Sequence, residues 1–221
     1  MEEHAQTSVV EGSTAQRKPR SRYYDGAPWA WLIDPLTSEV QDFVAAQIEP
    51  GVRVLDVGCG TGLLAIRLGQ KAAEVVGLEL SPVMLAYANR RLAAVAAPNV
   101  SFVLGDAATY LATRADGSFD TATMAFVLHE MPAEARAGVL RESARVARRV
   151  ICVDFMVPMP RSARGFFYRG IEVAGGPEHF RGFRDFGARG GTQGIAASAG
   201  LSCRQLGTVL GACVDVSEVR R

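Results

Sequence analysis

The sequence predicts an α/β fold in which a mostly parallel, doubly wound sheet carries helices on both faces. Apolar runs of strand length alternate with segments of helical periodicity from residue 52 to residue 155. This alternation is typical of strand–helix–strand units, in which helices join parallel strands and cover the sheet. The 221 residues, 48% of them hydrophobic, are enough for one domain with a sizeable core.

The first part of the chain contrasts with the rest. Residues 1–22 lack apolar periodicity, so we expect a disordered tail ahead of a single domain over residues 23–221. A solvated tail is the simplest interpretation of its basic cluster, and a contact with phosphate or RNA is the alternative. That cluster comprises Arg17, Lys18, Arg20 and Arg22. A helix is expected over residues 36–48, where apolar residues recur at helical spacing.

The most informative stretch is residues 54–62, Val-Leu-Asp-Val-Gly-Cys-Gly-Thr-Gly. It predicts a buried strand with Asp56 near its end and a glycine loop that opens a helix. Such a loop lets the backbone approach a nucleotide without a Cβ in the way. The glycines at 58, 60 and 62 are one residue short of the spacing of dinucleotide-binding folds. Asp56 suits a cationic ligand and would repel a pyrophosphate.

Two further strands are expected to end at the same edge of the sheet. Residues 74–79 form a strand that ends in Glu79, which could accept hydrogen bonds from both hydroxyls of a ribose. Ser81 and Pro82 then predict a helix start. Residues 100–104 form the next strand, and Asp106 follows it directly. These acids and Asp56 therefore share one edge.

The fourth strand is predicted over residues 118–128, and His129 follows it. Its end lies beside the first strand, at the topological switch point where ligands bind in doubly wound sheets. An imidazole there could take a proton from a hydroxyl or an amine. A structural role in holding the loop is the alternative, and Glu130 is a second candidate for chemistry.

The last third of the chain departs from strict alternation. A helix over 133–147, with Arg136 on its outer face, leads into a strand over 150–155. Residues 155–186 combine arginines with aromatic residues, which could hold an anionic or planar compound. A polar lid packed by its phenylalanines is the alternative. We then expect a last helix over 187–199 and a hairpin of strands 201–208 and 212–219.

These residues resemble the motifs of the class I S-adenosylmethionine-dependent methyltransferases, in particular the small-molecule enzymes of the ubiquinone and menaquinone type. The resemblance spans about residues 23–220, and its specific motifs lie in 54–62, 77–81 and 105–107. It implies a Rossmann-like sheet of seven strands with an antiparallel last strand. It also implies that residues 155–186 form an acceptor-binding insertion, or lid.

The resemblance implies a set of contacts with the cofactor, S-adenosyl-L-methionine. The glycine loop would cradle its methionine part, Glu79 its ribose, and Asp106 its adenine amino group. Leu80 would pack on the adenine, and Ala107 would offer its backbone N–H. Tyr24 lies in a segment that covers the cofactor in this family. The candidate cofactor-binding residues are Tyr24, Asp56, Gly58, Cys59, Gly60, Gly62, Glu79, Leu80, Asp106 and Ala107.

The implied function is transfer of a methyl group to a small-molecule acceptor by in-line displacement, with S-adenosyl-L-homocysteine as the product. His129 is the candidate catalytic residue, although alignment and desolvation can supply most of the acceleration without a base. An RNA or protein methyltransferase is one alternative, supported by the basic tail and the arginines of 161–190. A non-catalytic scaffold that binds S-adenosyl-L-homocysteine is another. The glycine spacing and Asp56 oppose a nicotinamide-dependent oxidoreductase.

Composition narrows the range of partners. The formal net charge of +1 gives no basic field for nucleic acid, and no apolar run has the length of a membrane span. The start of the chain lacks the apolar segment of a secretory signal. The four cysteines show neither metal-ligand spacing nor a disulfide framework, so we expect buried thiols, no metal ion, and a cytoplasmic location.

Overall fold

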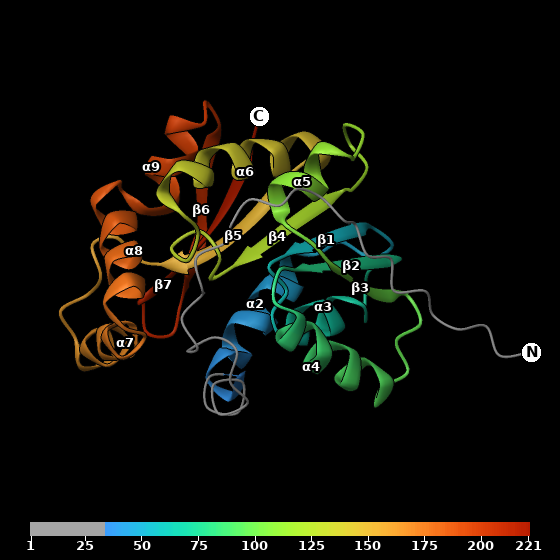
Figure 1. Ribbon diagram of the computed structural model, residues 1–221, viewed down its shortest axis with the longest axis horizontal. Helices are drawn as coiled ribbons and strands as arrows, with labels where there is room; N and C mark the ends of the chain where they lie inside the picture. Colours follow the sequence, from blue (N-terminus) through green and yellow to red (C-terminus); the bar gives the residue numbers. More distant parts are fainter. Residues whose placement is uncertain (1–33) are drawn as a thin grey trace, which may run out of the picture.

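The computed structural model describes residues 34–221 (Figure 1). The tail expected over residues 1–22 and the candidate cofactor contact Tyr24 lie outside this range. Within it, seven strands form one sheet in the order β3-β2-β1-β4-β5-β7-β6. The strands are β1 (Arg53–Val57), β2 (Glu74–Glu79), β3 (Val100–Leu104), β4 (Thr121–Ala125), β5 (Val150–Phe155), β6 (Ser202–Val209) and β7 (Val214–Arg220).

The pairing of the strands confirms the predicted fold class. Strands β1 to β5 pair with one another in parallel, and β7 runs antiparallel to both β5 and β6. The sheet is therefore mostly parallel, with an antiparallel last strand. Between β1 and β4 the chain order reverses, so the switch point lies where these two strands end.

Helices cover both faces of the sheet (Figure 1). One face carries α2 (Ser38–Gln47), α3 (Leu63–Leu68) and α4 (Pro82–Ala93), with the short 3-10 helix η1 (Asp34–Thr37) ahead of α2. The other face carries α5 (Ala107–Ala112), α6 (Ala133–Val146) and α9 (Gly191–Ser198). Two more helices, α7 (Ala163–Ala174) and α8 (Pro177–Ala188), lie together at one end of the sheet.

Burial on both faces explains why the central strands are so apolar. All six residues of β5 are buried, and so are the last four of β1. Parallel strands covered on both sides lose the alternation of apolar and polar residues that marks a half-exposed sheet. The continuous apolar runs in the sequence are the consequence of this layering.

Two predicted boundaries were wrong. Strand β4 ends at Ala125, three residues earlier than expected, because Phe126 has a left-handed backbone (φ 57°) that turns the chain out of the ladder. The predicted last helix begins in α8 and is broken at Gly190, the residue before α9; Gly190 and Gly191, the first residue of α9, both have positive φ. Glycine is the residue that adopts this conformation without steric cost.

Two findings bear on the expected environment of the chain. Between residues 34 and 221, none of the helices combines the length and the apolar character that crossing a membrane requires. All four cysteines are free thiols, and Cys59, Cys152 and Cys213 are buried, whereas Cys203 is half-buried.

Candidate functional site

The glycine loop after β1 is fastened to the neighbouring strand by its backbone. The N–H groups of Gly58 and Cys59 both donate to the carbonyl oxygen of Leu78, at 2.7 and 3.0 Å. Gly58, Gly60 and Gly62 all have positive φ, from 54° to 78°. The loop can follow this path because glycine pays no Cβ penalty in the left-handed region.

Glu79, at the end of β2, holds the same loop through its side chain. Its Oε2 accepts a hydrogen bond from the Gly60 N–H at 3.0 Å. Its Oε1 accepts from the N–H groups of Leu80 and Ser81, at 2.8 and 2.7 Å. The carboxylate is only 8% exposed and therefore acts as a hub between the glycine loop and the start of α4.

A cavity of about 170 Å³ lies under the glycine loop. Four of the predicted cofactor-binding residues line it: Asp56, Gly58, Cys59 and Gly60. The other described candidates, Gly62, Glu79, Leu80, Asp106 and Ala107, are not among its lining residues. Glu79 is the last residue of β2, and the other four follow β1, β2 or β3 at the same edge of the sheet. Their roles toward the cofactor stay predictions.

Asp56 is the most unusual group in this cavity, because it is a carboxylate that is 1% exposed. Its Oδ1 accepts a hydrogen bond from the Thr123 hydroxyl at 2.7 Å, whereas its Oδ2 has no hydrogen-bond partner within residues 34–221. Burial raises the pKa of Asp56 to about 7; the Thr123 hydrogen bond opposes this and the charge of Glu79 adds to it. A buried, half-satisfied carboxylate of this kind suits a cationic ligand.

One polar bridge beside this cavity was missed by the sequence analysis. Arg91 of α4 forms an ion pair with Asp34 of η1 at 2.6 Å, and its Nη1 donates to the Thr61 hydroxyl at 2.6 Å. The Thr61 hydroxyl is also within hydrogen-bond distance of both Asp34 carboxylate oxygens. Asp34 and Thr61 both line the cavity. The bridge joins residues 34, 61 and 91, whose sequence spacing gives no signal of a contact.

A second cavity adjoins the first, and Thr37 and Phe126 line both. Its wall is largely aromatic and aliphatic, and His129, Glu130 and Glu172 form its polar part. Three of its lining residues, Tyr168, Ile171 and Glu172, come from α7. The full lining consists of Leu36, Thr37, Phe126, His129, Glu130, Phe155, Tyr168, Ile171, Glu172 and Leu210.

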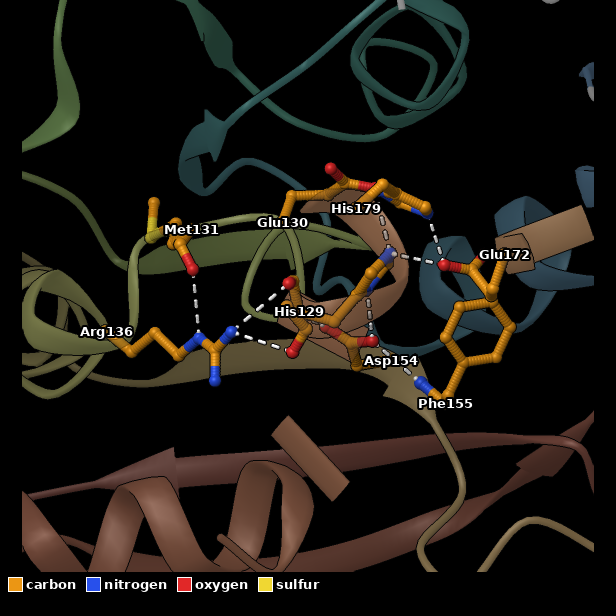
Figure 2. Close-up of polar contacts among 9 residues, drawn as sticks. His129, Glu130, Met131, Arg136, Asp154, Phe155, Glu172 and His179 are labelled. Carbon is orange, nitrogen blue, oxygen red and sulfur yellow. Dashed lines mark hydrogen bonds and ion pairs between the residues drawn. The ribbon is translucent and has the colours of Figure 1, made fainter. Parts of the chain in front are cut away.

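His129 lies in the loop after β4, with its side chain 3% exposed (Figure 2). Its Nδ1 is 2.7 Å from Oδ1 of Asp154, and its Nε2 is 3.0 Å from Oε1 of Glu130. Burial lowers the pKa of His129, but the charges of Asp154 and Glu130 outweigh this and hold it well above its ordinary value. Asp154 lies one residue before the end of its strand, as Asp56 does, and this was the signal that could have identified it.

His179 and Glu172 complete the polar group around His129. His179 Nδ1 is 3.2 Å from Glu130 Oε1, and His179 Nε2 contacts Glu172 Oε2. The pKa of His179 is raised to about 9: burial lowers it, and the hydrogen bonds to Glu130 and Glu172 more than compensate. Burial raises the pKa of Glu130, but the two histidines bring it down to about 2. The sequence analysis did not identify His179 or Glu172 as a partner of His129.

Arg136 corrects a prediction, because it points inward rather than to solvent. Its side chain is 1% exposed and forms an ion pair with Asp185 of α8 at 2.8 Å. Its other N–H groups donate to the carbonyl oxygens of Met131, His129 and Gly182 (Figure 2). Arg136 therefore fastens the loop that carries His129 to both α6 and α8.

Comparison with known protein families decides the kind of domain. Residues 54–150 match the family model described as "Methyltransferase domain". Over this range, called the methyltransferase domain below, the chain is similar to that family. The match runs from β1 to the start of β5, so it contains the glycine loop, Glu79 and His129.

Two curated relatives resemble part of this chain. A demethylmenaquinone methyltransferase of Beutenbergia cavernae is 36% identical over 113 residues, 49% of this chain and 43% of that protein. A magnesium-protoporphyrin O-methyltransferase of Rhodobacter capsulatus is 41% identical over 70 residues, 32% of this chain and 30% of that protein. The chain thus matches less than half the length of either relative.

The structural likeness extends further along the chain. A SAM-dependent methyltransferase from Aquifex aeolicus superposes with a TM-score of 0.60 and 20% identity, covering 93% of this chain and all of that one. At this identity the likeness shows the fold, including the strands and helices that follow the methyltransferase domain.

Replacing Gly60 with alanine tests whether the cavity under the glycine loop binds a ligand. A Cβ added at Gly60 has no atom within 4 Å, so Gly60→Ala is expected to cost only about 1 kcal/mol, from the left-handed backbone. The added methyl group would stand at the wall of the cavity, so we expect the affinity for S-adenosyl-L-homocysteine to fall about tenfold or more. Isothermal titration calorimetry measures the affinity, and urea unfolding measures the stability.

Gly51→Ala is the matched control for this prediction. Gly51 also has positive φ (77°) and open space around its Cβ position, but it lies in the turn before β1 and does not line the cavity. It should lose similar stability and keep its affinity. Equal affinities for both variants would contradict a ligand site in this cavity.

Glu79→Ala is expected to impair both folding and binding in the methyltransferase domain. It removes the acceptor of three backbone N–H groups, which should lower the free energy of unfolding by about 2 kcal/mol. If Glu79 also binds a ribose, the affinity for S-adenosyl-L-homocysteine falls at least tenfold. A 2′-deoxyribose analogue separates the two effects: it should bind wild type more weakly than the parent compound, and the Glu79→Ala variant with no further loss. If the Glu79→Ala variant binds S-adenosyl-L-homocysteine with the affinity of wild type, the ribose contact is refuted.

Proposed function

We propose that the protein is an S-adenosylmethionine-dependent methyltransferase that transfers a methyl group to a small-molecule acceptor. The observation that carries this proposal is the buried Asp56 carboxylate: its Oδ2 has no hydrogen-bond partner within the described range, and Asp56 lines a cavity under a glycine loop. The cofactor carries an ammonium and a sulfonium and no phosphate. A buried negative charge matches such a ligand, as does the methyltransferase domain around it.

The residues around the first cavity fit the cofactor. Gly60 leaves open space where a side chain would stand, and Asp56 supplies negative charge opposite a cation. Gly58, Cys59 and Gly60 would hold the methionine part, while Glu79, Leu80, Asp106 and Ala107 would hold the adenosine. The bound cofactor would supply an electrophilic methyl group. The task of the chain is then to align an acceptor with it and to exclude water.

The second cavity is the proposed acceptor site. Phe126, Phe155 and Tyr168 supply aromatic surface, and no arginine is among the lining residues that the structure describes. This supports a planar acceptor over an anionic one. The relatives named above fit a planar acceptor, because demethylmenaquinone and magnesium-protoporphyrin both contain planar ring systems.

His129 is the proposed catalytic residue, since it lines the acceptor cavity. Asp154 holds its Nδ1, which fixes the orientation of the ring and leaves Nε2 on the side of Glu130 and Glu172. A contact between His129 and the acceptor would position the attacking atom.

Cofactor labelled on its methyl group tests the proposal. The protein is incubated with labelled cofactor and a bacterial lysate separated into small molecules, RNA and protein. Label in the small-molecule fraction is the expected result and gives a compound to identify. Label in RNA or protein would overturn the choice of acceptor. Binding of S-adenosyl-L-homocysteine without any transfer would favour a non-catalytic scaffold.

A further inference from the structure

Four side chains from three segments converge beside the second cavity (Figure 2). His129 and Glu130 come from the loop after β4, Glu172 from α7 and His179 from α8. One nitrogen or carboxylate oxygen from each lies within 4.8 Å of all the others. Two imidazoles and two carboxylates are a common donor set for a transition-metal ion in proteins.

The spacing of these atoms is close to that of metal ligands. His129 Nε2 is 3.0 Å from Glu130 Oε1 and 3.8 Å from Glu172 Oε2, and His179 Nδ1 is 3.2 Å from Glu130 Oε1. Bonds of about 2.0–2.2 Å to a tetrahedral ion place the ligand atoms about 3.3–3.6 Å apart. Side-chain rotations would have to move ligand atoms by about 1 Å, because the four atoms lie within 4.8 Å of one another and His179 Nε2 contacts Glu172 Oε2 more closely than two metal ligands do.

The burial of the cluster is the second argument. The side chains of His129, Glu172 and His179 are 3%, 5% and 4% exposed. Glu172 Oε2 lies in contact with His179 Nε2 and 3.8 Å from His129 Nε2. Positive charge balances two carboxylates this close together, and a divalent cation at the point where all four side chains meet can supply it in place of the protons on the histidines.

The surroundings hold one of these ligands in the orientation that a metal requires. Asp154 accepts a hydrogen bond from His129 Nδ1, and is itself fixed by the N–H groups of His129 and Phe155. A carboxylate on the far nitrogen of a histidine is the usual second partner of a metal-bound imidazole. Arg136 fixes the His129 backbone and the adjacent turn of α8 through carbonyl oxygens of residues 129 and 182.

We propose that His129, Glu130, Glu172 and His179 bind a divalent first-row transition-metal ion, with His129 coordinating through Nε2. The two nitrogen donors disfavour magnesium and calcium, which take oxygen ligands. The ion would lie at the wall of the second cavity, and when it is bound, the ion rather than the His129 imidazole would contact an oxygen or nitrogen atom of the acceptor. This site goes beyond the proposed function, because metal binding can be measured without cofactor or acceptor.

Zinc binding to the full chain tests this site. The protein is stripped with a chelator and dialysed against micromolar free zinc, and bound metal is counted by elemental analysis. We expect one ion per chain and a rise in the melting temperature, since an ion that binds only the folded state stabilises it. Glu172→Gln is expected to weaken zinc binding tenfold or more.

Glu178→Gln is the matched control, because it makes the same change on an exposed residue next to His179. It should bind zinc as wild type does. His179→Gln provides a second ligand variant should Glu172→Gln fail to fold. The proposal is overturned if wild type binds no stoichiometric zinc, or if both ligand variants bind it with wild-type affinity, which would place the metal elsewhere on the chain.

Discussion

Replacing Asp56 with asparagine is expected to abolish a pH-dependent loss of stability of about 4 kcal/mol. Burial raises the pKa of Asp56 from 3.8 to about 7 in the folded protein. Below about pH 4 the side chain is protonated in both the folded and the unfolded state. As the pH rises toward 7, only the unfolded state releases the proton, so the free energy of unfolding falls and levels off above pH 7.

Urea unfolding of wild type and Asp56→Asn at several values between pH 4.5 and pH 8 measures this effect. The difference between the two proteins isolates Asp56 from the other titrating groups. Asp42→Asn is the control, because that side chain is 64% exposed and its ion pair with Arg67 contributes little. If wild type and Asp56→Asn lose stability in parallel, the buried carboxylate does not have a raised pKa.

The same ionisation should control ligand binding. The ammonium group of the ligand favours the charged carboxylate, so the affinity of wild type for S-adenosyl-L-homocysteine should rise about tenfold per pH unit up to pH 7. The affinity of Asp56→Asn should be lower and nearly constant over this range. Calorimetric titrations at pH 5.5, 6.5 and 7.5 distinguish the two profiles.

Arg136→Met is expected to destabilise the protein by about 4 kcal/mol, because it leaves the acceptors of a buried guanidinium without their donor. The variant loses the ion pair with Asp185 and the hydrogen bonds to the carbonyl oxygens of residues 129, 131 and 182. The loop with His129 is then no longer fastened to α8. Thermal and urea unfolding measure the loss.

Arg141→Met, on the same helix, is the control for this prediction. Arg141 is exposed and donates a single hydrogen bond, to the carbonyl oxygen of Ala199, so its replacement should cost less than about 1 kcal/mol. Similar losses for both variants would show that the buried contacts of Arg136 contribute little to stability.

Local sequence patterns were sufficient to predict the sheet and the glycine loop. The continuous apolar runs of β1 and β5 and the loop at residues 58–62 depend on short-range requirements of burial and backbone conformation. The end of β4 could not be predicted, because Phe126 has an ordinary side chain at a left-handed position that sequence rarely reveals.

The polar cluster depends on tertiary structure and therefore escaped prediction. Glu172 and His179 lie 43 and 50 residues after His129, on helices whose placement no periodicity indicates. Arg136 was assigned to solvent because arginine is mostly exposed in proteins. Its burial follows from Asp185 and three carbonyl oxygens that meet it from other segments.

A protein that binds an alkylating agent can be alkylated by it at a cysteine, and Cys59 is the cysteine placed where this could happen. Under the proposed function Cys59 lines the cavity that receives a methyl donor. The reactive form of cysteine is the thiolate, and burial, with added repulsion from Asp56 and Glu79, raises the pKa of Cys59 well above its ordinary value. The sulfur stays protonated and weakly nucleophilic at neutral pH. The carboxylates that favour a cation therefore also protect the protein from methylating itself.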